Sequence, residues 1–192
     1  MSTGQLHLIL GGARSGKSSY AEQWARERSG AVLFVATAQA YDEEMRQRIA
    51  RHRADRPAEW QTVEAPLQVA QALEAHLAQH SYQTIVLDCL TLLASNILLS
   101  LPETAEQDAV TAAILREVQA LLQLQQGSQA AWLIVSNEVG MGVVPPTRLG
   151  RFFRDGLGRA NQMVAQAADE VSLLVAGIAW QLKSARSAPE AS

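Results

Sequence analysis

The stretch GGARSGKSS, residues 11–19, follows an apolar segment and precedes a helical pattern. Within it, Gly11, Gly16, Lys17 and Ser18 match the motif G-x-x-x-x-G-K-[ST]. Such a loop turns backbone N–H groups towards phosphate oxygens, so glycine stands where a side chain would block the approach, and the following helix adds the positive end of its dipole. The stretch therefore predicts a phosphate-binding loop for a nucleoside triphosphate. The competing interpretation is a glycine-rich turn that carries a lysine by chance.

The motif also predicts a magnesium site. Lys17 is placed to reach the β- and γ-phosphates and to stabilise charge on the transferring phosphoryl group, while the hydroxyl of Ser18 ligates Mg²⁺. A second acid is needed for the ion at the end of another strand, and TIVLD, residues 84–88, has that form. Asp88 has an alternative role as the cap of a helix that starts near Thr91, but beside a phosphate loop we favour the metal.

Short apolar segments alternate with helical patterns along the chain. The predicted strands are Leu6–Leu10, Val32–Ala36, Thr84–Leu87, Trp132–Val135 and Val171–Ala176. The predicted helices are Ser18–Arg28, a segment that contains Met45 and Ile49, Leu67–His80, Ala105–Gln126 and Arg148–Ala168. Strands that are apolar throughout are typical of a parallel sheet covered on both faces. The sequence predicts an α/β P-loop NTPase fold of the RecA-like type, with three layers and a mostly parallel sheet.

The length of 192 residues predicts one domain, residues 1–183, followed by a frayed tail at 184–192. A net charge of -3 argues against nucleic acid or an anionic membrane as a partner. The segment 84–101 approaches membrane-spanning length, but Asp88 would lie inside the bilayer, so we expect a buried strand and a buried helix there, and no membrane span. The single cysteine, Cys89, excludes an internal disulfide and favours a cytoplasmic location.

Two classes of nucleotide-binding protein lack support in the sequence. A small regulatory GTPase carries an N-K-x-D motif for guanine, whereas here the segment SNEVG has Glu138 at the lysine position. A nucleic-acid motor has a basic track or aromatic residues interleaved with basic ones, and neither pattern is present. A small-molecule kinase or a nucleotidyltransferase remains, with a regulatory or motor ATPase as the alternative from another class.

Four stretches together resemble one family: GGARSGKSSYAE, VATAQAYDEEMRQRIARHRADRPAEWQTVEAP, VLDCLT and IVSNEVGMGVVPPTRLGRFFRDGLGRANQMVAQAADEV. From Leu6 to about Gly177, the chain is similar to the bifunctional adenosylcobinamide kinase / adenosylcobinamide-phosphate guanylyltransferase family of cobalamin biosynthesis. The resemblance implies ATP and GTP as nucleotide substrates, adenosylcobinamide and adenosylcobinamide phosphate as the other substrates, and a homo-oligomer, namely a trimer.

The resemblance also implies two successive reactions. A nucleoside triphosphate first phosphorylates the aminopropanol hydroxyl of adenosylcobinamide. GMP then passes from GTP through a covalent histidine intermediate to adenosylcobinamide phosphate, which gives adenosyl-GDP-cobinamide. A kinase that lacks the transferase step is the alternative within the enzymes.

The resemblance assigns the covalent intermediate to His52, in the block RIARHRADRP, residues 48–57. Without the resemblance, a histidine on a polar helix face is most simply a solvated surface residue. The neighbouring Arg51, Arg53 and Arg56 favour the functional role, because guanidinium groups bind phosphate oxygens and nearby cations favour the neutral, nucleophilic imidazole. The nucleotide contacts that the resemblance and the motif imply are Gly11, Gly12, Ala13, Arg14, Ser15, Gly16, Lys17, Ser18, Ala36, Thr37, Ala38, Arg53, Ala54, Asp55, Arg56, Glu64 and Asp88.

Two features stay open at this point. NEVGMGVVP, residues 137–145, follows a predicted strand, and it either contacts the corrinoid or a neighbouring subunit or is a structural turn. Arg148, Arg151 and Arg154 recur every three residues, a spacing that puts them on one helix face, where they either meet substrate phosphate or are solvated.

Overall fold

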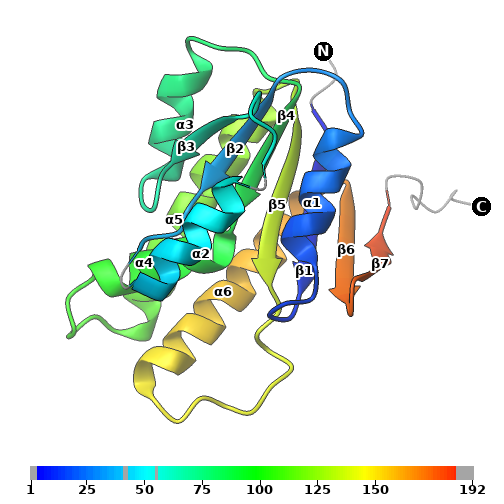
Figure 1. The fold of residues 1–192 in the computed structure, drawn as a ribbon. Coiled ribbons are helices and arrows are strands. Elements are labelled where there is room, and N and C mark those ends of the chain that lie inside the picture. Colours follow the sequence, from blue (N-terminus) through cyan, green and yellow to red (C-terminus); the bar gives the residue numbers. More distant parts are fainter. Residues whose placement is uncertain (1–3, 41–42, 55, 185–192) are drawn as a thin grey trace, which may run out of the picture.

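The computed structural model describes residues 4–40, 43–54 and 56–184. In these residues, seven strands form one sheet in the order β3-β2-β4-β5-β1-β6-β7 (Figure 1). The strands are β1 (Leu6–Gly11), β2 (Val32–Ala36), β3 (Gln61–Glu64), β4 (Thr84–Asp88), β5 (Ala131–Asn137), β6 (Glu170–Val175) and β7 (Ile178–Lys183). The helices are α1 (Lys17–Arg26), α2 (Glu43–Ala54), α3 (Val69–Leu77), α4 (Leu90–Ser100), α5 (Gln107–Gln126) and α6 (Arg148–Ala167). Neighbouring strands are parallel except for β6 and β7, which confirms the predicted mostly parallel sheet.

Helices cover both faces of the sheet, so the predicted three-layer α/β architecture is confirmed (Figure 1). On one face, α1 packs through Ala21 and Ala25 against side chains of β1, β2 and β4. On the other face, α3 to α6 contribute Leu73, Leu93, Ile114 and Leu157 to the larger apolar core. Every residue of β2 is buried, as expected for a strand inside such a sheet.

The segment 84–101 folds as the buried strand β4 followed by the largely buried helix α4, as predicted. Among the described residues, none of the helices is long and apolar enough to cross a membrane. The expected tail begins at Ser184, and its remaining residues, 185–192, lie outside the described part of the chain.

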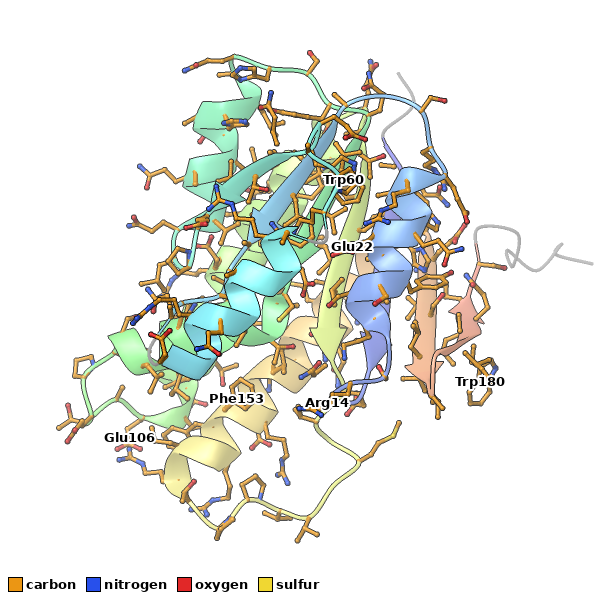
Figure 2. All side chains as sticks on the ribbon, viewed as in Figure 1. Arg14, Glu22, Trp60, Glu106, Phe153 and Trp180 are labelled. Carbon is orange, nitrogen blue, oxygen red and sulfur yellow. The ribbon has the colours of Figure 1, made fainter. Side chains whose placement is uncertain are left out.

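The sequence prediction missed the two edge strands. In β3, QTVE, only Val63 is apolar, so no apolar run marks the strand. In β7 the apolar side chains face outwards: Trp180 is 65% exposed, and Figure 2 shows it standing clear of the sheet. The turn before β7 consists of Ala176 and Gly177, both with positive φ, a geometry typical of two-residue hairpins.

The carboxyl ends of β1, β2, β4 and β5 meet at one edge of the sheet. The phosphate loop follows β1, and Asp88 ends β4. Because β5 lies between these two strands, its last residue, Asn137, pairs with Gly11 in the register of the sheet. Three functional elements therefore converge at this edge, where open parallel sheets bind their ligands.

Candidate active site

The predicted phosphate loop connects β1 to α1 by a tight turn. A Cβ atom on Gly11 would lie 2.5 Å from the carbonyl oxygen of Leu174, so the loop packs too closely for any other residue there. Gly16 precedes α1 with φ 96°, a left-handed conformation that glycine adopts without steric cost. These two positions explain why the motif demands glycine.

Lys17 lies against the loop. Its side chain is only 7% exposed, and its Nζ donates a hydrogen bond of 2.6 Å to the carbonyl oxygen of Gly12. Burial lowers the pKa of Lys17, and the negative charge of Asp88 partly offsets this effect. The ammonium group is thus held against the predicted phosphate loop, at the edge of the cavity that the loop lines.

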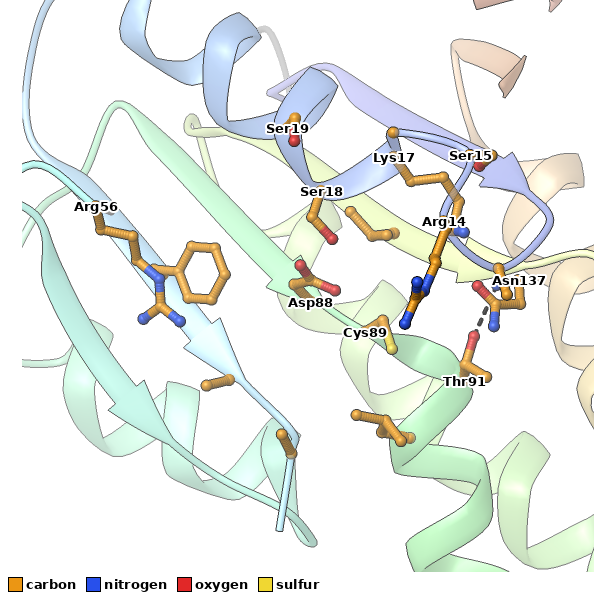
Figure 3. A pocket seen from close by; sticks show the side chains of 17 residues that line it. Arg14, Ser15, Lys17, Ser18, Ser19, Arg56, Asp88, Cys89, Thr91 and Asn137 are labelled. Carbon is orange, nitrogen blue, oxygen red and sulfur yellow. Dashed lines mark hydrogen bonds between the residues drawn. The ribbon is translucent and has the colours of Figure 1, made fainter. Parts of the chain in front are cut away.

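A cavity of about 490 Å³ opens in front of the loop, a size typical of small-molecule sites. The implied nucleotide contacts that line it are Ala13, Arg14, Ser15, Gly16, Lys17, Ser18, Ala36, Ala38, Arg56 and Asp88. Gly11 and Gly12 belong to the same loop without lining the cavity. Figure 3 shows Arg56 and Asn137 at opposite ends of the cavity, with Ser18 and Asp88 between them.

The residues at the centre fit a magnesium ion. Ser18 and Asp88 line the cavity together (Figure 3), and α4 is capped at Cys89, so Asp88 does not take its alternative role as the helix cap. Within the described residues, no group of three or more His, Cys, Asp or Glu side chains is arranged to hold a metal. One hydroxyl and one carboxylate suit Mg²⁺, because this ion keeps waters and takes phosphate oxygens instead of filling an all-protein cage.

Thr37 is buried and stays outside the cavity lining. Its Oγ1 accepts a hydrogen bond from the Cys89 backbone N–H at 2.8 Å and donates one to the Cys89 carbonyl at 2.7 Å. Asn96 Nδ2 donates to the Thr37 carbonyl at 2.8 Å. Thr37 therefore links the end of β2 to the turn that follows Asp88, and it does not line the cavity beside the other implied nucleotide contacts.

A smaller cavity of about 300 Å³ adjoins the first. It is lined by Ala36, Ala38, Ala40, Arg46, Arg53, Arg56 and Glu64, so three of its residues, Ala36, Ala38 and Arg56, line both cavities. Arg53 and Glu64 form an exposed ion pair at 3.3 Å. The smaller cavity thus brings the implied contacts Arg53, Arg56 and Glu64 together next to the larger cavity.

Arg56 stands between the two cavities. The carbon of its guanidinium lies 3.7 Å from the ring centre of Phe34, and its Nη1 donates to Thr62 Oγ1 at 3.3 Å. Burial lowers the pKa of Arg56, with the acids Glu22 and Asp88 acting in the opposite direction. A cation stacked on an aromatic ring is held in one orientation, which suits a phosphate-binding group.

His52 belongs to α2, the helix that supplies Arg46 and Arg53 to the smaller cavity. Its backbone is one residue from that lining, while its side chain lies outside the described part of the structure. Ala54 is exposed and lines neither cavity, and the implied contact Asp55 lies outside the described residues.

The sequence analysis missed several residues of the larger cavity, among them Phe34, Thr91, Leu92 and Asn137. Asn137 carries the clearest signal in retrospect, because it directly follows a fully apolar strand, and the carboxyl ends of such strands reach the ligand edge. The side chains of α4 carry no such signal, since their orientation depends on where that helix begins.

The two open features differ in their surroundings. Arg148 pairs with Glu106 at 3.0 Å, and Arg151 donates to the Pro146 carbonyl at 2.8 Å, so internal groups already engage both cations. In the segment 137–145, Met141 is 82% and Val143 is 94% exposed. A structural turn does not require such exposure of apolar side chains.

Comparisons with known proteins agree with this site. A family model for cobinamide kinase / cobinamide phosphate guanyltransferase, CobU, matches residues 7–182. The bifunctional adenosylcobalamin biosynthesis protein CobU of Salmonella typhimurium is 43% identical over 181 residues, which cover 92% of this chain and 98% of that protein. The Escherichia coli protein of the same name is 41% identical over 181 residues, with the same shares. The bifunctional protein CobP of Pseudomonas aeruginosa is 43% identical over 176 residues, covering 92% of this chain and 96% of that protein.

Among solved structures, the flagellar accessory protein FlaH of Methanocaldococcus jannaschii matches with a TM-score of 0.48 and 15% identity, covering 96% of this chain and 80% of that chain. This likeness is too distant to carry a conclusion.

Proposed function

The chain belongs to the cobinamide kinase / cobinamide phosphate guanyltransferase family, and on this premise we propose that it catalyses both reactions that the family's description states. It phosphorylates the aminopropanol hydroxyl of adenosylcobinamide, and it then transfers GMP from GTP to the resulting phosphate, which gives adenosyl-GDP-cobinamide. The observation that carries the proposal is the match over residues 7–182, which includes the phosphate loop and both cavities.

In the kinase step, the phosphate loop and Lys17 hold the β- and γ-phosphates of the nucleotide. Ser18 and Asp88 would hold Mg²⁺, which neutralises charge on the phosphates. The substrate hydroxyl oxygen forms a bond to the γ-phosphorus, the bond from that phosphorus to the bridging oxygen breaks, and the hydroxyl proton passes to solvent. The residues here act by position and charge, because phosphoryl transfer needs little covalent help from the protein.

In the guanylyltransferase step, an imidazole nitrogen of His52 attacks the α-phosphorus of GTP, and pyrophosphate leaves as the α–β bridging bond breaks. An oxygen of adenosylcobinamide phosphate then attacks the same phosphorus, and the phosphorus–nitrogen bond breaks to restore the imidazole. Arg53 and Arg56 support this step, since they line the cavity next to the helix of His52 and neutralise phosphate charge.

The remaining expectations belong to the same proposal. Residues 1–183 act as one domain, since all seven strands of the described residues join one sheet. The protein acts in the cytoplasm, which its single cysteine favours, and it assembles as a homo-oligomer, a trimer by family resemblance. The exposed apolar side chains of the segment 137–145 contact the corrinoid, whose ring system offers apolar surface.

Product analysis tests the two reactions separately. Wild type incubated with ATP, Mg²⁺ and adenosylcobinamide should form adenosylcobinamide phosphate, and addition of GTP should convert it to adenosyl-GDP-cobinamide. His52→Ala should keep the first reaction and lose the second, whereas His80→Ala, which replaces an exposed histidine that lines neither cavity, should keep both. A His52→Ala protein that still forms the GDP product would refute the assignment, and a wild type that forms only the phosphate would reduce the protein to a kinase.

A further inference from the structure

Asn137 lies at the ligand edge of the sheet, and its side chain makes no hydrogen bond to another described residue. It ends β5, the strand that lies between the strand of the phosphate loop and the strand of Asp88. It also lines the larger cavity. In the sheet, this position lies between the phosphate loop and Asp88, which the proposed kinase step assigns to the γ-phosphate and its metal.

The backbone of Asn137 is fixed from two sides. Thr91 Oγ1 accepts a hydrogen bond from its N–H at 2.7 Å, and Asn161 Nδ2 donates to its carbonyl at 3.0 Å. The buried hydroxyl of Ser136 donates to Asn161 Oδ1 at 2.6 Å, which holds that amide in place. Side chains from α4 and α6 thus hold the backbone of the residue in position, and Figure 3 shows the contact with Thr91.

The side-chain amide of Asn137 is unengaged. Within residues 4–40, 43–54 and 56–184, no hydrogen bond joins it to another group of the chain. A rigid backbone that presents a free amide to a phosphate cavity is preorganised, because no internal bond has to break before it binds a ligand.

From this arrangement we propose that Asn137 is a catalytic residue of the phosphoryl-transfer step, which donates a hydrogen bond from Nδ2 to an oxygen of the γ-phosphoryl group as it moves to the acceptor hydroxyl. The inference rests on the proposed kinase activity. The equatorial oxygens of the transferring group carry negative charge, and Lys17 and the metal site contact it from other directions. The amide of Asn137 on β5 adds a further donor to these oxygens.

The position of Asn137 predicts that the two reactions respond differently to its loss. Arg46 and Arg53, from the helix of His52, line the smaller cavity together with Arg56. Figure 3 shows Asn137 at the opposite end of the larger cavity from Arg56. Attack on the α-phosphorus takes place near His52, so it does not depend on a donor to the γ-phosphoryl group. A purely structural residue would instead impair both reactions and nucleotide binding together.

The test compares Asn137→Ala and Asn137→Asp with wild type. The matched control is Gln129→Ala, which removes an exposed amide just before the opposite end of β5. Three quantities are measured: the kcat of phosphoryl transfer from ATP to adenosylcobinamide, the rate of ATP hydrolysis without acceptor, and the rate of GMP attachment to the protein from GTP. Calorimetric Kd values for ATP and melting temperatures accompany them.

Both Asn137 variants should lose about 100-fold in kcat of phosphoryl transfer, the usual effect of removing one preorganised donor. Asn137→Ala should keep the Kd for ATP and the rate of GMP attachment within about threefold of wild type, and its melting temperature should not change. Asn137→Asp keeps the shape of the side chain but adds a negative charge beside the phosphates, so it should also bind ATP more weakly. Its kcat of phosphoryl transfer at saturating ATP serves as the second measurement if Asn137→Ala does not fold.

Two results would overturn the inference: a kcat of phosphoryl transfer within about threefold of wild type, or equal losses in phosphoryl transfer and GMP attachment. If wild type hydrolyses ATP but does not phosphorylate adenosylcobinamide, the proposed function fails, and the hydrolysis rates of the variants still decide the role of Asn137.

Discussion

Replacement of Thr37 by valine should destabilise the protein and disturb the metal site together. The two side chains have nearly the same shape, so Thr37→Val removes a hydroxyl from a fully buried position without leaving a large cavity. The hydroxyl bonds both the N–H and the carbonyl of Cys89. The carbonyl keeps a second donor, the N–H of Leu93 at 3.2 Å, whereas the N–H of Cys89 loses its partner.

The expected magnitude follows from these bonds. A buried N–H without a partner costs about 1–3 kcal/mol, and the lost bond to the carbonyl adds about 0.5–1.5 kcal/mol. We therefore expect the free energy of unfolding to fall by about 1.5–4.5 kcal/mol. For a chain of this size, that corresponds to a decrease in Tm of roughly 3–18 °C. Asp88 directly precedes Cys89, so the apparent affinity for Mg²⁺ in the kinase reaction should weaken as well.

The assay combines thermal and urea unfolding with a magnesium titration of kinase activity. Thr104→Val serves as the control, because Thr104 is exposed and far from this edge in sequence. A Thr37→Val protein whose Tm lies within about 1 °C of wild type, a smaller change than one lost hydrogen bond predicts, would refute the role assigned to the hydroxyl.

Three more predictions follow from the geometry. Gly11→Ala puts a methyl group 2.5 Å from the Leu174 carbonyl, so the loop must shift, and calorimetry should show a loss of at least about tenfold in ATP affinity; an unchanged Kd would contradict the packing argument. Arg56→Lys keeps the charge but loses the planar stack on Phe34, and rapid-quench measurements should show GMP attachment slowed more than phosphoryl transfer; equal slowing would contradict its position between the cavities. Burial lowers the pKa of His7 from 6.5, with Glu170 partly offsetting it, so the unfolded chain takes up this proton at higher pH than the folded chain. The stabilisation is complete above pH 6.5 and is lost as the pH falls below it. The free energy of unfolding, measured with urea, should therefore fall more for wild type than for His7→Gln between pH 7.5 and 5.5, and parallel profiles would contradict this.

Much of the fold could be predicted because buried parallel strands are apolar on both faces. The five central strands are therefore visible as continuous apolar runs, and the phosphate loop fixes which of them comes first. The edge strands β3 and β7 were not predicted, because β3 has a single apolar residue and the apolar residues of β7 are exposed instead of buried in the sheet. Their pairing depends on neighbours that are distant in sequence.

The candidate site was predictable where a motif specifies both residue type and spacing. Lys17, Ser18 and Asp88 meet in one cavity as their positions at the ends of β1 and β4 required. Thr37 lies outside the cavity lining because its hydroxyl is used by the turn after β4, a contact that no local pattern reveals. Asn137 enters the site only because β5 lies between β1 and β4, and strand order is a property of the whole sheet.

The most direct test of the central claim is the intact mass of the protein after incubation with GTP and Mg²⁺. The spectra are taken at neutral or basic pH, because the phosphorus–nitrogen bond to an imidazole is labile to acid. We predict that wild type gains the mass of one GMP, that His52→Ala gains none, and that addition of adenosylcobinamide phosphate removes the adduct from wild type. An adduct on His52→Ala, or no adduct on a wild type that still forms adenosyl-GDP-cobinamide, would contradict the account.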